Sequence, residues 1–208
     1  MFGVIIGLDI KDFSKTTRTN EMLVQREKLV KIINNGIADI EIYRKRKVVD
    51  TGDGCYILID SGDYENILLG LKKIQLKAQE SETFKFRGIV HVGKYEKTTK
   101  ILDENTTTES YVGEGINEAS RYLDAQCLKE LLKKNTQNFV YGISNELYMQ
   151  IFDQKYYNES EYSRYLFKTK NYSNQIFLNI AGIDCLPDAE NTGGNSSNTK
   201  ENLKRLWY

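Results

Sequence analysis

The chain has 208 residues, the length of one ordinary domain that can bury a core. Its composition, 40% hydrophobic and 11% aromatic, is typical of a folded rather than a disordered protein. Lysine plus arginine and aspartate plus glutamate balance at 29 each, so a broadly basic surface is not indicated and we expect no nucleic-acid partner.

Cysteine usage and hydropathy favour a reducing compartment. Cys55, Cys127 and Cys185 are widely spaced and odd in number, which argues against a disulfide framework and against a zinc site. The N-terminal residues show no charged-then-apolar signal, and no run approaches the length of a membrane span. We therefore expect a cytoplasmic protein without a membrane span.

The first predicted elements are a strand and a helix. Residues 2–10 are almost continuously apolar, as in a strand buried on both faces, and Asp9 is the anomaly because an unpaired buried carboxylate is costly. A strand-end aspartate that leans into solvent or caps the next turn would explain it equally well. The amides of the polar segment 11–14 are placed to face an anion where a helix begins. Residues 21–33 predict that helix, ended by Asn-Asn-Gly at 34–36.

A tight hairpin follows. Apolar, β-branched runs flank Thr-Gly-Asp-Gly at 51–54, which predicts two strands joined by a short turn. The glycines remove side chains and allow positive φ, so the backbone can approach a ligand closely. Asp53 at the tip is well placed to hold a hard cation such as Mg²⁺. Most Gly-Asp-Gly turns are only turns, and the motif alone does not decide between the two interpretations.

The middle of the chain predicts a helix, a strand and a loop. Residues 64–79 form an amphipathic helical pattern, and residues 84–93 a strand. That strand contains the only histidine, His91, whose apolar neighbours favour a structural role over a catalytic one. Residues 98–110 are polar and threonine-rich, and we expect a loop there.

A second helix is predicted over 116–123, opened by Val-Gly-Glu-Gly at 112–115. Its side chains Asn117 and Arg121 are four residues apart and therefore project from one side together. An ordinary solvated helix face would also explain that pair, so the spacing alone assigns it no function.

The remainder of the chain predicts a strand from 138, a short helix at 144–152, and two further strands, the last at 175–180. No internal repeat or second domain is evident. We therefore expect one domain over 1–181, followed at 182–208 by a flexible tail rich in glycine, asparagine and serine that ends in a short C-terminal segment.

Four segments, taken in chain order, resemble the motifs of the class III nucleotidyl cyclases. They are Asp-Ile-x-x-Phe-Ser at 9–14, Thr-Gly-Asp-Gly at 51–54, Arg-Gly-Ile-Val-His-Val-Gly at 87–93, and Val-Gly-x-Gly-Ile-Asn-x-Ala-Ser-Arg at 112–121. The resemblance implies an α+β, ferredoxin-like fold in which an antiparallel-rich central sheet is flanked by helices. It also implies a reaction in which the ribose 3′-oxygen of a nucleoside triphosphate attacks the α-phosphorus and pyrophosphate leaves.

The resemblance assigns a two-metal site. Asp9 and Asp53 match the metal-binding aspartates of the family, often joined by a backbone carbonyl at the position of Ile10. Two divalent cations, Mg²⁺ or Mn²⁺, about 3.5–4 Å apart would activate the 3′-hydroxyl and neutralise the triphosphate. The choice between the two metals stays open, because both take oxygen ligands in similar geometry.

The resemblance also assigns phosphate and ribose contacts. Asn117 matches a residue that orients the ribose, and Arg121 one that stabilises charge on the transferring phosphoryl group, as a planar guanidinium does well. Arg87 matches an arginine that grips the triphosphate, and Lys168 or Lys170 lies in the region of a further phosphate-binding lysine. The backbone amides of a turn would wrap the phosphates; its residues are Lys11, Asp12, Phe13 and Ser14.

In this family the metal aspartates meet the asparagine and arginine of the helix across a dimer interface. The resemblance therefore implies a head-to-tail homodimer with two equivalent shared sites. Because one chain carries both sets of residues, no second gene product is needed for the chemistry.

Two positions depart from the family pattern. Adenylate cyclases place a lysine three residues before the hairpin glycine and an aspartate seven before the catalytic asparagine, whereas this chain has Val49 and Ser110. Guanylate cyclases tend to carry glutamate at the first position. Since discrimination between bases depends on buried polar partners, purine selection by the usual route is not expected.

This pattern resembles the bacterial pyrimidine cyclases of the Pycsar anti-phage defence systems. They make cyclic UMP or cyclic CMP, which acts on a separate effector protein. We expect UTP slightly ahead of CTP as the substrate. The candidate base-pocket residues are Lys47, Val49, Ser110 and Tyr111; Lys47 and Val49 share one face of a strand, and Tyr111 would help to fill the space that a smaller base leaves.

Three alternatives stay open. The nearest is an adenylate or guanylate cyclase with atypical base recognition. A non-catalytic nucleotide-binding homologue is disfavoured because all four of Asp9, Asp53, Asn117 and Arg121 are present. A ferredoxin-like nucleic-acid-binding module is disfavoured by the neutral charge and by the lack of an aromatic RNA-reading strand.

Overall fold

The computed structural model describes residues 1–81, 84–103, 106–152, 161–169 and 172–181. The tail predicted over 182–208 lies outside these ranges. Among the described helices, none combines the length and the apolar composition that a membrane crossing requires.

A seven-stranded sheet forms the centre of the molecule, in the strand order β2-β3-β1-β4-β7-β9-β8. Neighbouring strands are antiparallel except for the pair β4 and β7, which is parallel. The strands are β1 (Phe2–Ile10), β2 (Lys47–Asp50), β3 (Gly54–Ile59), β4 (Phe86–Lys94), β7 (Phe139–Ser144), β8 (Tyr162–Thr169) and β9 (Tyr172–Asn179).

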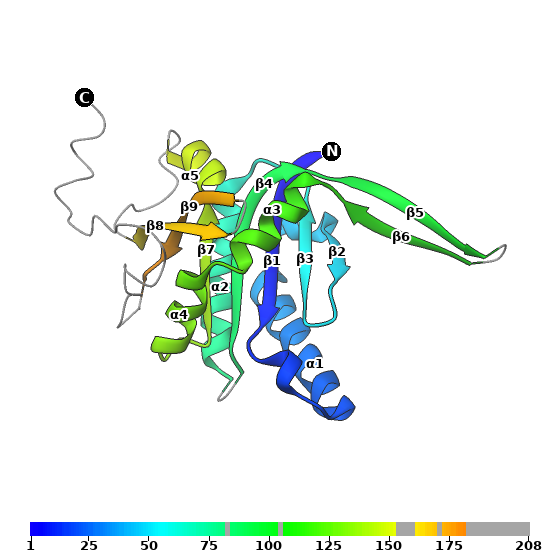
Figure 1. Ribbon diagram of the computed structural model, residues 1–208, viewed down its shortest axis with the longest axis horizontal. Helices are drawn as coiled ribbons and strands as arrows, with labels where there is room; N and C mark the ends of the chain where they lie inside the picture. The colour runs from blue at the N-terminus through cyan, green and yellow to red at the C-terminus, as the bar shows by residue number, and fades with distance from the viewer. Residues whose placement is uncertain (82–83, 104–105, 153–160, 170–171, 182–208) are drawn as a thin grey trace.

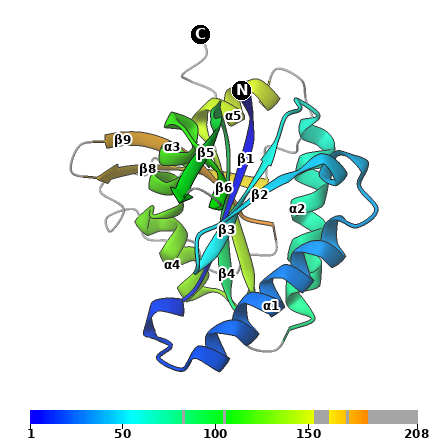
Figure 2. The same ribbon diagram turned by 90° about the vertical axis from the view of Figure 1, so that its right-hand side faces the viewer.

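Helices cover both faces of this sheet. In Figure 2, α1 and α2 lie on one side and α3 and α4 on the other, with α5 at one end. The helices are α1 (Thr19–Ile37), α2 (Tyr64–Gln79), α3 (Glu114–Leu123), α4 (Gln126–Lys134) and α5 (Asn145–Phe152), with short 3₁₀ turns η1 (Phe13–Lys15) and η2 (Glu41–Lys45). The predicted mixed α+β fold with a largely antiparallel sheet is confirmed.

The two covered faces explain why β1 is apolar along almost its whole length. Side chains alternate between faces along a strand. Val4, Ile6 and Leu8 join the core under α1 and α2, whereas Ile5 joins the core under α3 and α4. By the same alternation Asp9 points to the α3/α4 face. The parity of this strand therefore decides on which side of the sheet the carboxylate lies.

The prediction that the first helix ends at Asn-Asn-Gly was wrong. Helix α1 continues to Ile37, and Gly36 is a buried residue inside it. A side chain at Gly36 would come within 2.9 Å of the backbone of Ile74 on α2. This glycine therefore lets two helices approach closely instead of ending one of them.

The loop predicted over 98–110 was also wrong. Strands β5 (Glu96–Asp103) and β6 (Thr106–Val112) pair antiparallel in a two-stranded ribbon that projects away from the body (Figure 1). Threonine is β-branched and favours strands, so the threonine-rich composition fits a β-ribbon. Helix α4 was not predicted, although its buried residues recur with helical spacing: Cys127, Leu128, Leu131 and Leu132.

Candidate active site

The hairpin between β2 and β3 holds Asp53 at an exposed tip. The amide of Thr51 donates to the carbonyl of Gly54 at 3.2 Å, and the amide of Gly52 donates to Asp50 Oδ1 at 2.7 Å. Gly52 has φ +90°, a conformation that favours glycine. Thr51 Oγ1 donates to Asp53 Oδ1 at 3.0 Å, which orients the carboxylate.

The hairpin tip is docked against the end of β1. The amide of Ile10 donates to the carbonyl of Asp53 at 2.9 Å, and Asp9 pairs with Gly54 in the sheet register. A Cβ atom at Gly54 would lie 1.9 Å from the carbonyl oxygen of Leu8, so only glycine permits this approach. The hairpin motif therefore does more than turn the chain, because it brings two aspartates together.

Asp9 and Asp53 line one cavity of about 290 Å³. Besides these two carboxylates it is lined by Leu8, Thr51, Tyr56, Arg87, Ser120, Leu123 and Asp124. Asp9 and Arg87 enter from the sheet, Asp53 from the hairpin, and Ser120 from α3. The cavity therefore gathers residues that are far apart in the sequence.

Asp9 and Arg87 form the most buried ion pair of this cavity. Arg87 Nη2 lies 2.5 Å from Asp9 Oδ2, and their side chains are only 14% and 16% exposed. Burial raises the pKa of Asp9 to about 6, an effect that Arg87 opposes and that the nearby Asp53 and Asp124 reinforce. Arg87 Nε is buried and has no hydrogen-bond partner among the described residues, so it still has a donor to offer.

The donor set fits a cation that arrives with phosphates. Within the described ranges no cluster of three or more histidine, cysteine, aspartate or glutamate side chains is arranged to hold a metal on its own. Mg²⁺ is usually held by one or two carboxylates together with substrate phosphates and water. Asp9 and Asp53 supply two such carboxylates to one cavity, and metal binding by them and by the carbonyl of Ile10 stays a prediction.

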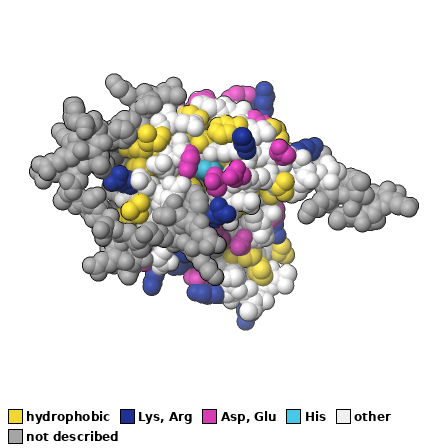
Figure 3. Space-filling model, turned by 45° about the horizontal axis from the view of Figure 1, so that its top comes forward, with side chains coloured by type: hydrophobic (Ala, Val, Ile, Leu, Met, Phe, Trp, Pro, Cys, Tyr) yellow, Lys and Arg dark blue, Asp and Glu magenta, His cyan; other side chains and the backbone are white. Residues whose placement is uncertain are grey.

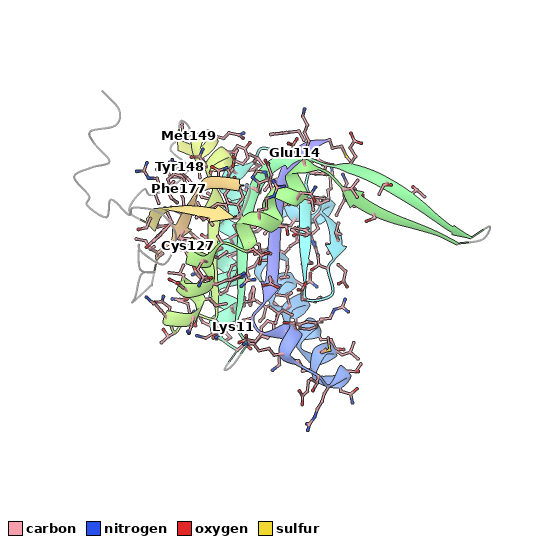
Figure 4. All side chains as sticks on the ribbon, viewed as in Figure 1. Lys11, Glu114, Cys127, Tyr148, Met149 and Phe177 are labelled. Carbon is pink, nitrogen blue, oxygen red and sulfur yellow. The ribbon has the colours of Figure 1, made fainter. Side chains whose placement is uncertain are left out.

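The predicted phosphate turn follows β1 directly, and Figure 4 places Lys11 at this end of the sheet. The amide of Lys11 donates to the carbonyl of Lys85 at 2.9 Å and is therefore already used. Asp12 has φ 60° and forms an ion pair with Lys15 at 2.6 Å. Phe13 is buried in the α1/α2 core, and Ser14 is exposed. The predicted phosphate binding by this turn would therefore use amides other than that of Lys11.

The helix pair does not reach the cavity of its own chain. Asn117 and Arg121 are both exposed on α3, and the cavity is lined from this helix by Ser120 and Leu123 instead. In Figure 4 the first residue of α3, Glu114, lies at the end of the sheet opposite Lys11, so the helix runs toward the aspartates. One chain therefore presents two separate groups of predicted catalytic residues.

The two predicted phosphate-binding lysines are not placed. Lys168 belongs to β8, but its side chain lies outside what the structure describes, and Lys170 lies outside the described residues altogether. Both stay predictions.

Three of the four predicted base-pocket residues lie together. Lys47 and Val49 share one face of β2, and Lys47 Nζ lies 5.7 Å from the ring centre of Tyr111. Val49 and Tyr111 both pack against the core under α3 and α4. Ser110 precedes Tyr111 in β6, and side chains alternate, so it points to the opposite face of the ribbon.

These predicted base-pocket residues are connected to the cavity that contains Asp9 and Asp53. Val49 pairs across the hairpin with Tyr56, which lines the cavity that Asp9 and Asp53 share. Lys47 forms an ion pair with Asp60, and Tyr95 donates to the same carboxylate. Sequence reasoning did not identify Tyr56, Asp60, Tyr95, Ser120 or Asp124. Ser120 and Asp124 are four residues apart, so helical spacing would have placed them together on one side of the helix.

His91 is fully buried and structural in its contacts, as predicted. Its Nδ1 lies 2.9 Å from Ser144 Oγ and its Nε2 lies 3.1 Å from Glu118 Oε2. Figure 3 shows acidic side chains beside this histidine. Burial lowers its pKa, although the nearby Glu146 opposes that shift.

No family model matches the chain, and neither does any curated protein. Solved structures do match. The guanylyl cyclase Cya2 is 15% identical with a TM-score of 0.54, over 92% of this chain and 96% of that one. The adenylyl cyclase CyaB from P. aeruginosa is 13% identical with a TM-score of 0.55, over 90% and 96%. This chain has the class III nucleotidyl cyclase fold. A bacterial light-regulated adenylyl cyclase shares it, at 11% identity and a TM-score of 0.58 over 88% and 92% of the two chains.

Proposed function

We propose that the protein is a nucleotidyl cyclase that converts a nucleoside triphosphate to its 3′,5′-cyclic nucleotide and pyrophosphate. The observation that carries this proposal is the docking of the hairpin on β1, which gives Asp9 and Asp53 a common cavity with Arg87 beside them. The cyclase fold and the four sequence motifs support the same conclusion.

The residues of the cavity are suited to position a triphosphate. When bound at Asp9 and Asp53, divalent cations would polarise the 3′-hydroxyl and neutralise phosphate charge. Arg87 offers its buried Nε–H to a phosphate oxygen, and such a charge-assisted hydrogen bond is stronger than one between neutral groups. Catalysis would then be positioning and electrostatic stabilisation, without a covalent intermediate.

The site is proposed to form between two copies of the chain. Asn117 and Arg121 are exposed and lie outside their own cavity, so a head-to-tail partner can supply them. There Asn117 orients the ribose and Arg121 stabilises the transferring phosphoryl group. Among the proteins with this fold is a non-canonical dimeric guanylyl cyclase domain from Blastocladiella emersonii, which supports assembly as a homodimer.

Mixing inactive variants tests the shared site. Asp9→Ala and Arg121→Ala chains, mixed under conditions in which subunits exchange, are expected to regain activity through one rebuilt site per heterodimer. A mixture of Asp9→Ala and Asp53→Ala is the matched control, because both changes damage the same half of the site and no intact site can form. Activity no higher in the first mixture than in the control would contradict a shared site.

The proposed substrate is UTP, with CTP as the second pyrimidine. Val49 and Ser110 stand where purine-reading side chains are expected, and the ring centres of Tyr95 and Tyr111 lie 5.9 and 5.7 Å from Lys47 Nζ, beside Val49 on β2. A smaller base suits this arrangement. The cyclic product would act in the cytoplasm on a separate effector protein of an anti-phage system, without direct contact between the two proteins.

A purine substrate is the second candidate. The solved structures named above are guanylyl and adenylyl cyclases, and a related guanylate cyclase domain from Catenaria anguillulae was solved in complex with GTP. A non-catalytic nucleotide-binding homologue is the third candidate and predicts binding without turnover.

One experiment separates these candidates. The purified protein is incubated with ATP, GTP, CTP or UTP and Mn²⁺, and products are identified by mass, with Asp53→Ala as the inactive control. Cyclic UMP or cyclic CMP is expected from the wild-type chain alone. Dominant cyclic AMP or cyclic GMP would overturn the pyrimidine assignment, and no cyclic product from any nucleotide would overturn the enzyme.

A further inference from the structure

Arg87 lies between two carboxylates. Its Nη2 is 2.5 Å from Asp9 Oδ2 and 3.7 Å from Asp124 Oδ1. These are its only two ion pairs within the described residues. Asp124 follows the last residue of α3. The same oxygen, Asp124 Oδ1, also forms an ion pair with Lys129 Nζ on α4 at 3.0 Å.

Cation binding and the present position of Arg87 conflict. A divalent cation on the oxygens of Asp9 would meet the guanidinium that now lies 2.5 Å from that carboxylate. Two positive charges cannot share this acceptor at low cost in a partly buried site. Arg87 is only 14% exposed, so it cannot turn fully into solvent and must find another negative partner.

Asp124 is placed to be that partner. It lines the same cavity and already approaches the same nitrogen. Its side chain is 65% exposed, so it has room to rotate by the short distance that a direct ion pair requires. In the metal-free protein, the ion pair with Lys129 keeps this carboxylate beside the cavity.

We propose that Asp124 is a positioning residue that takes over Arg87 when a divalent cation binds Asp9 and Asp53, so that the arginine stays at the cavity wall with its Nε–H directed at the triphosphate. This inference rests on the proposed function, because it assumes that the two aspartates bind metal. In the metal-free protein Arg87 neutralises Asp9, and in the metal-bound protein it pairs with Asp124. Asp124 acts through Arg87 and touches neither metal nor nucleotide.

A different role for Asp124 is to bind the metal itself. The two roles differ in how the effect of Asp124 depends on Arg87. If Asp124 acts by accepting Arg87, its removal has no consequence once the guanidinium is gone. If Asp124 binds the metal, its removal weakens binding whether or not Arg87 is present.

A double-mutant cycle of Mn²⁺ binding tests this without nucleotide or turnover. Mn²⁺ is titrated into the full chain and the free ion is measured by electron paramagnetic resonance. We expect Asp124→Asn to weaken binding about two- to fivefold, the size of a partly exposed ion pair. Asp124→Glu restores binding, and in the Arg87→Gln background Asp124→Asn has no effect. Glu130→Gln, which removes a carboxylate from α4 that does not contact Arg87, is the matched control and leaves binding unchanged.

Three results would overturn the inference: an equal loss in both backgrounds, no loss in either, or no saturable Mn²⁺ binding to the wild-type chain. Cyclase assays on the same variants separate this inference from the proposed function. Asp124→Asn is expected to raise the metal concentration needed for half-maximal rate and to lower kcat at saturating metal, because Arg87 is then no longer held toward the triphosphate. Cyclic product without the coupling refutes only the role of Asp124, and coupling without product refutes only the cyclase.

Discussion

Replacing Gly54 by alanine should separate Asp9 and Asp53, the two proposed metal ligands. The new Cβ atom would lie 1.9 Å from the carbonyl oxygen of Leu8 and 2.8 Å from its carbonyl carbon, both of them backbone atoms that cannot rotate away. Strand β3 must therefore withdraw from β1. Gly52→Ala is the matched control in the same turn, because Gly52 has φ +90° but nothing within 4 Å of its Cβ position.

The size of the effect follows from these contacts. A retreat of about 1 Å is needed to reach even a 3.0 Å contact, and it would break the 2.9 Å hydrogen bond from Ile10 to Asp53. Overpacking costs about 1–3 kcal/mol and a lost hydrogen bond about 1 kcal/mol, so we expect Gly54→Ala to lower the free energy of unfolding by about 3 kcal/mol. Gly52→Ala should cost about 1 kcal/mol, from backbone strain alone.

Urea unfolding followed by circular dichroism measures the stability difference, and Mn²⁺ titration measures the site. Gly54→Ala is expected to lose Mn²⁺ binding under conditions where the chain is still folded, because Asp53 moves away from Asp9. Gly52→Ala should keep it. Equal stability losses in the two variants, together with unchanged Mn²⁺ binding in Gly54→Ala, would refute the structural reasoning.

Three further predictions concern packing and pH. Gly36→Ala should lower the free energy of unfolding by about 1–3 kcal/mol, because the new Cβ would lie 2.9 Å from the backbone of Ile74. Gly62→Ala is the control and should leave the stability unchanged, because no atom lies nearer than 3.8 Å to its Cβ position. Thermal melts compare the two variants. Burial lowers the pKa of His91 below 6.5, so as the pH falls the unfolded chain binds this proton before the folded chain does. The free energy of unfolding should therefore decrease as the pH drops through 6.5, and this slope, measured from urea midpoints, should be absent in His91→Asn. The pKa of Asp9 is raised from 3.8 to about 6, so its stabilising contribution is complete below pH 3.8 and lost as the pH rises through 6. In EDTA, the free energy of unfolding of the wild type should therefore decrease over this pH range relative to that of Asp9→Asn. The same pH dependence in both proteins would contradict this.

Local sequence patterns predicted most of the framework. The apolar run of β1 and the amphipathic pattern of α2 gave the observed bounds, Phe2–Ile10 and Tyr64–Gln79. The turn at 51–54 was recognised from its Gly-Asp-Gly residues between two apolar strands, because strands, helices and turns each have a characteristic local pattern of residue types. The same rules failed at Gly36, where the deciding contact is with Ile74 on another helix, and in the β5–β6 ribbon, where polar threonines resembled a loop.

The sequence by itself determined which side chains are available for the proposed chemistry: Asp9 and Asp53, Arg87, and the pair Asn117 and Arg121. Only the tertiary structure decided which of them meet. The sheet register sets Asp9 opposite both Gly54 and Arg87, the parity of β1 turns Asp9 toward α3, and the end of α3 brings Asp124 to the same arginine. These pairings join residues that are 37 or more positions apart, and such contacts depend on how whole elements pack, which no short stretch of sequence specifies.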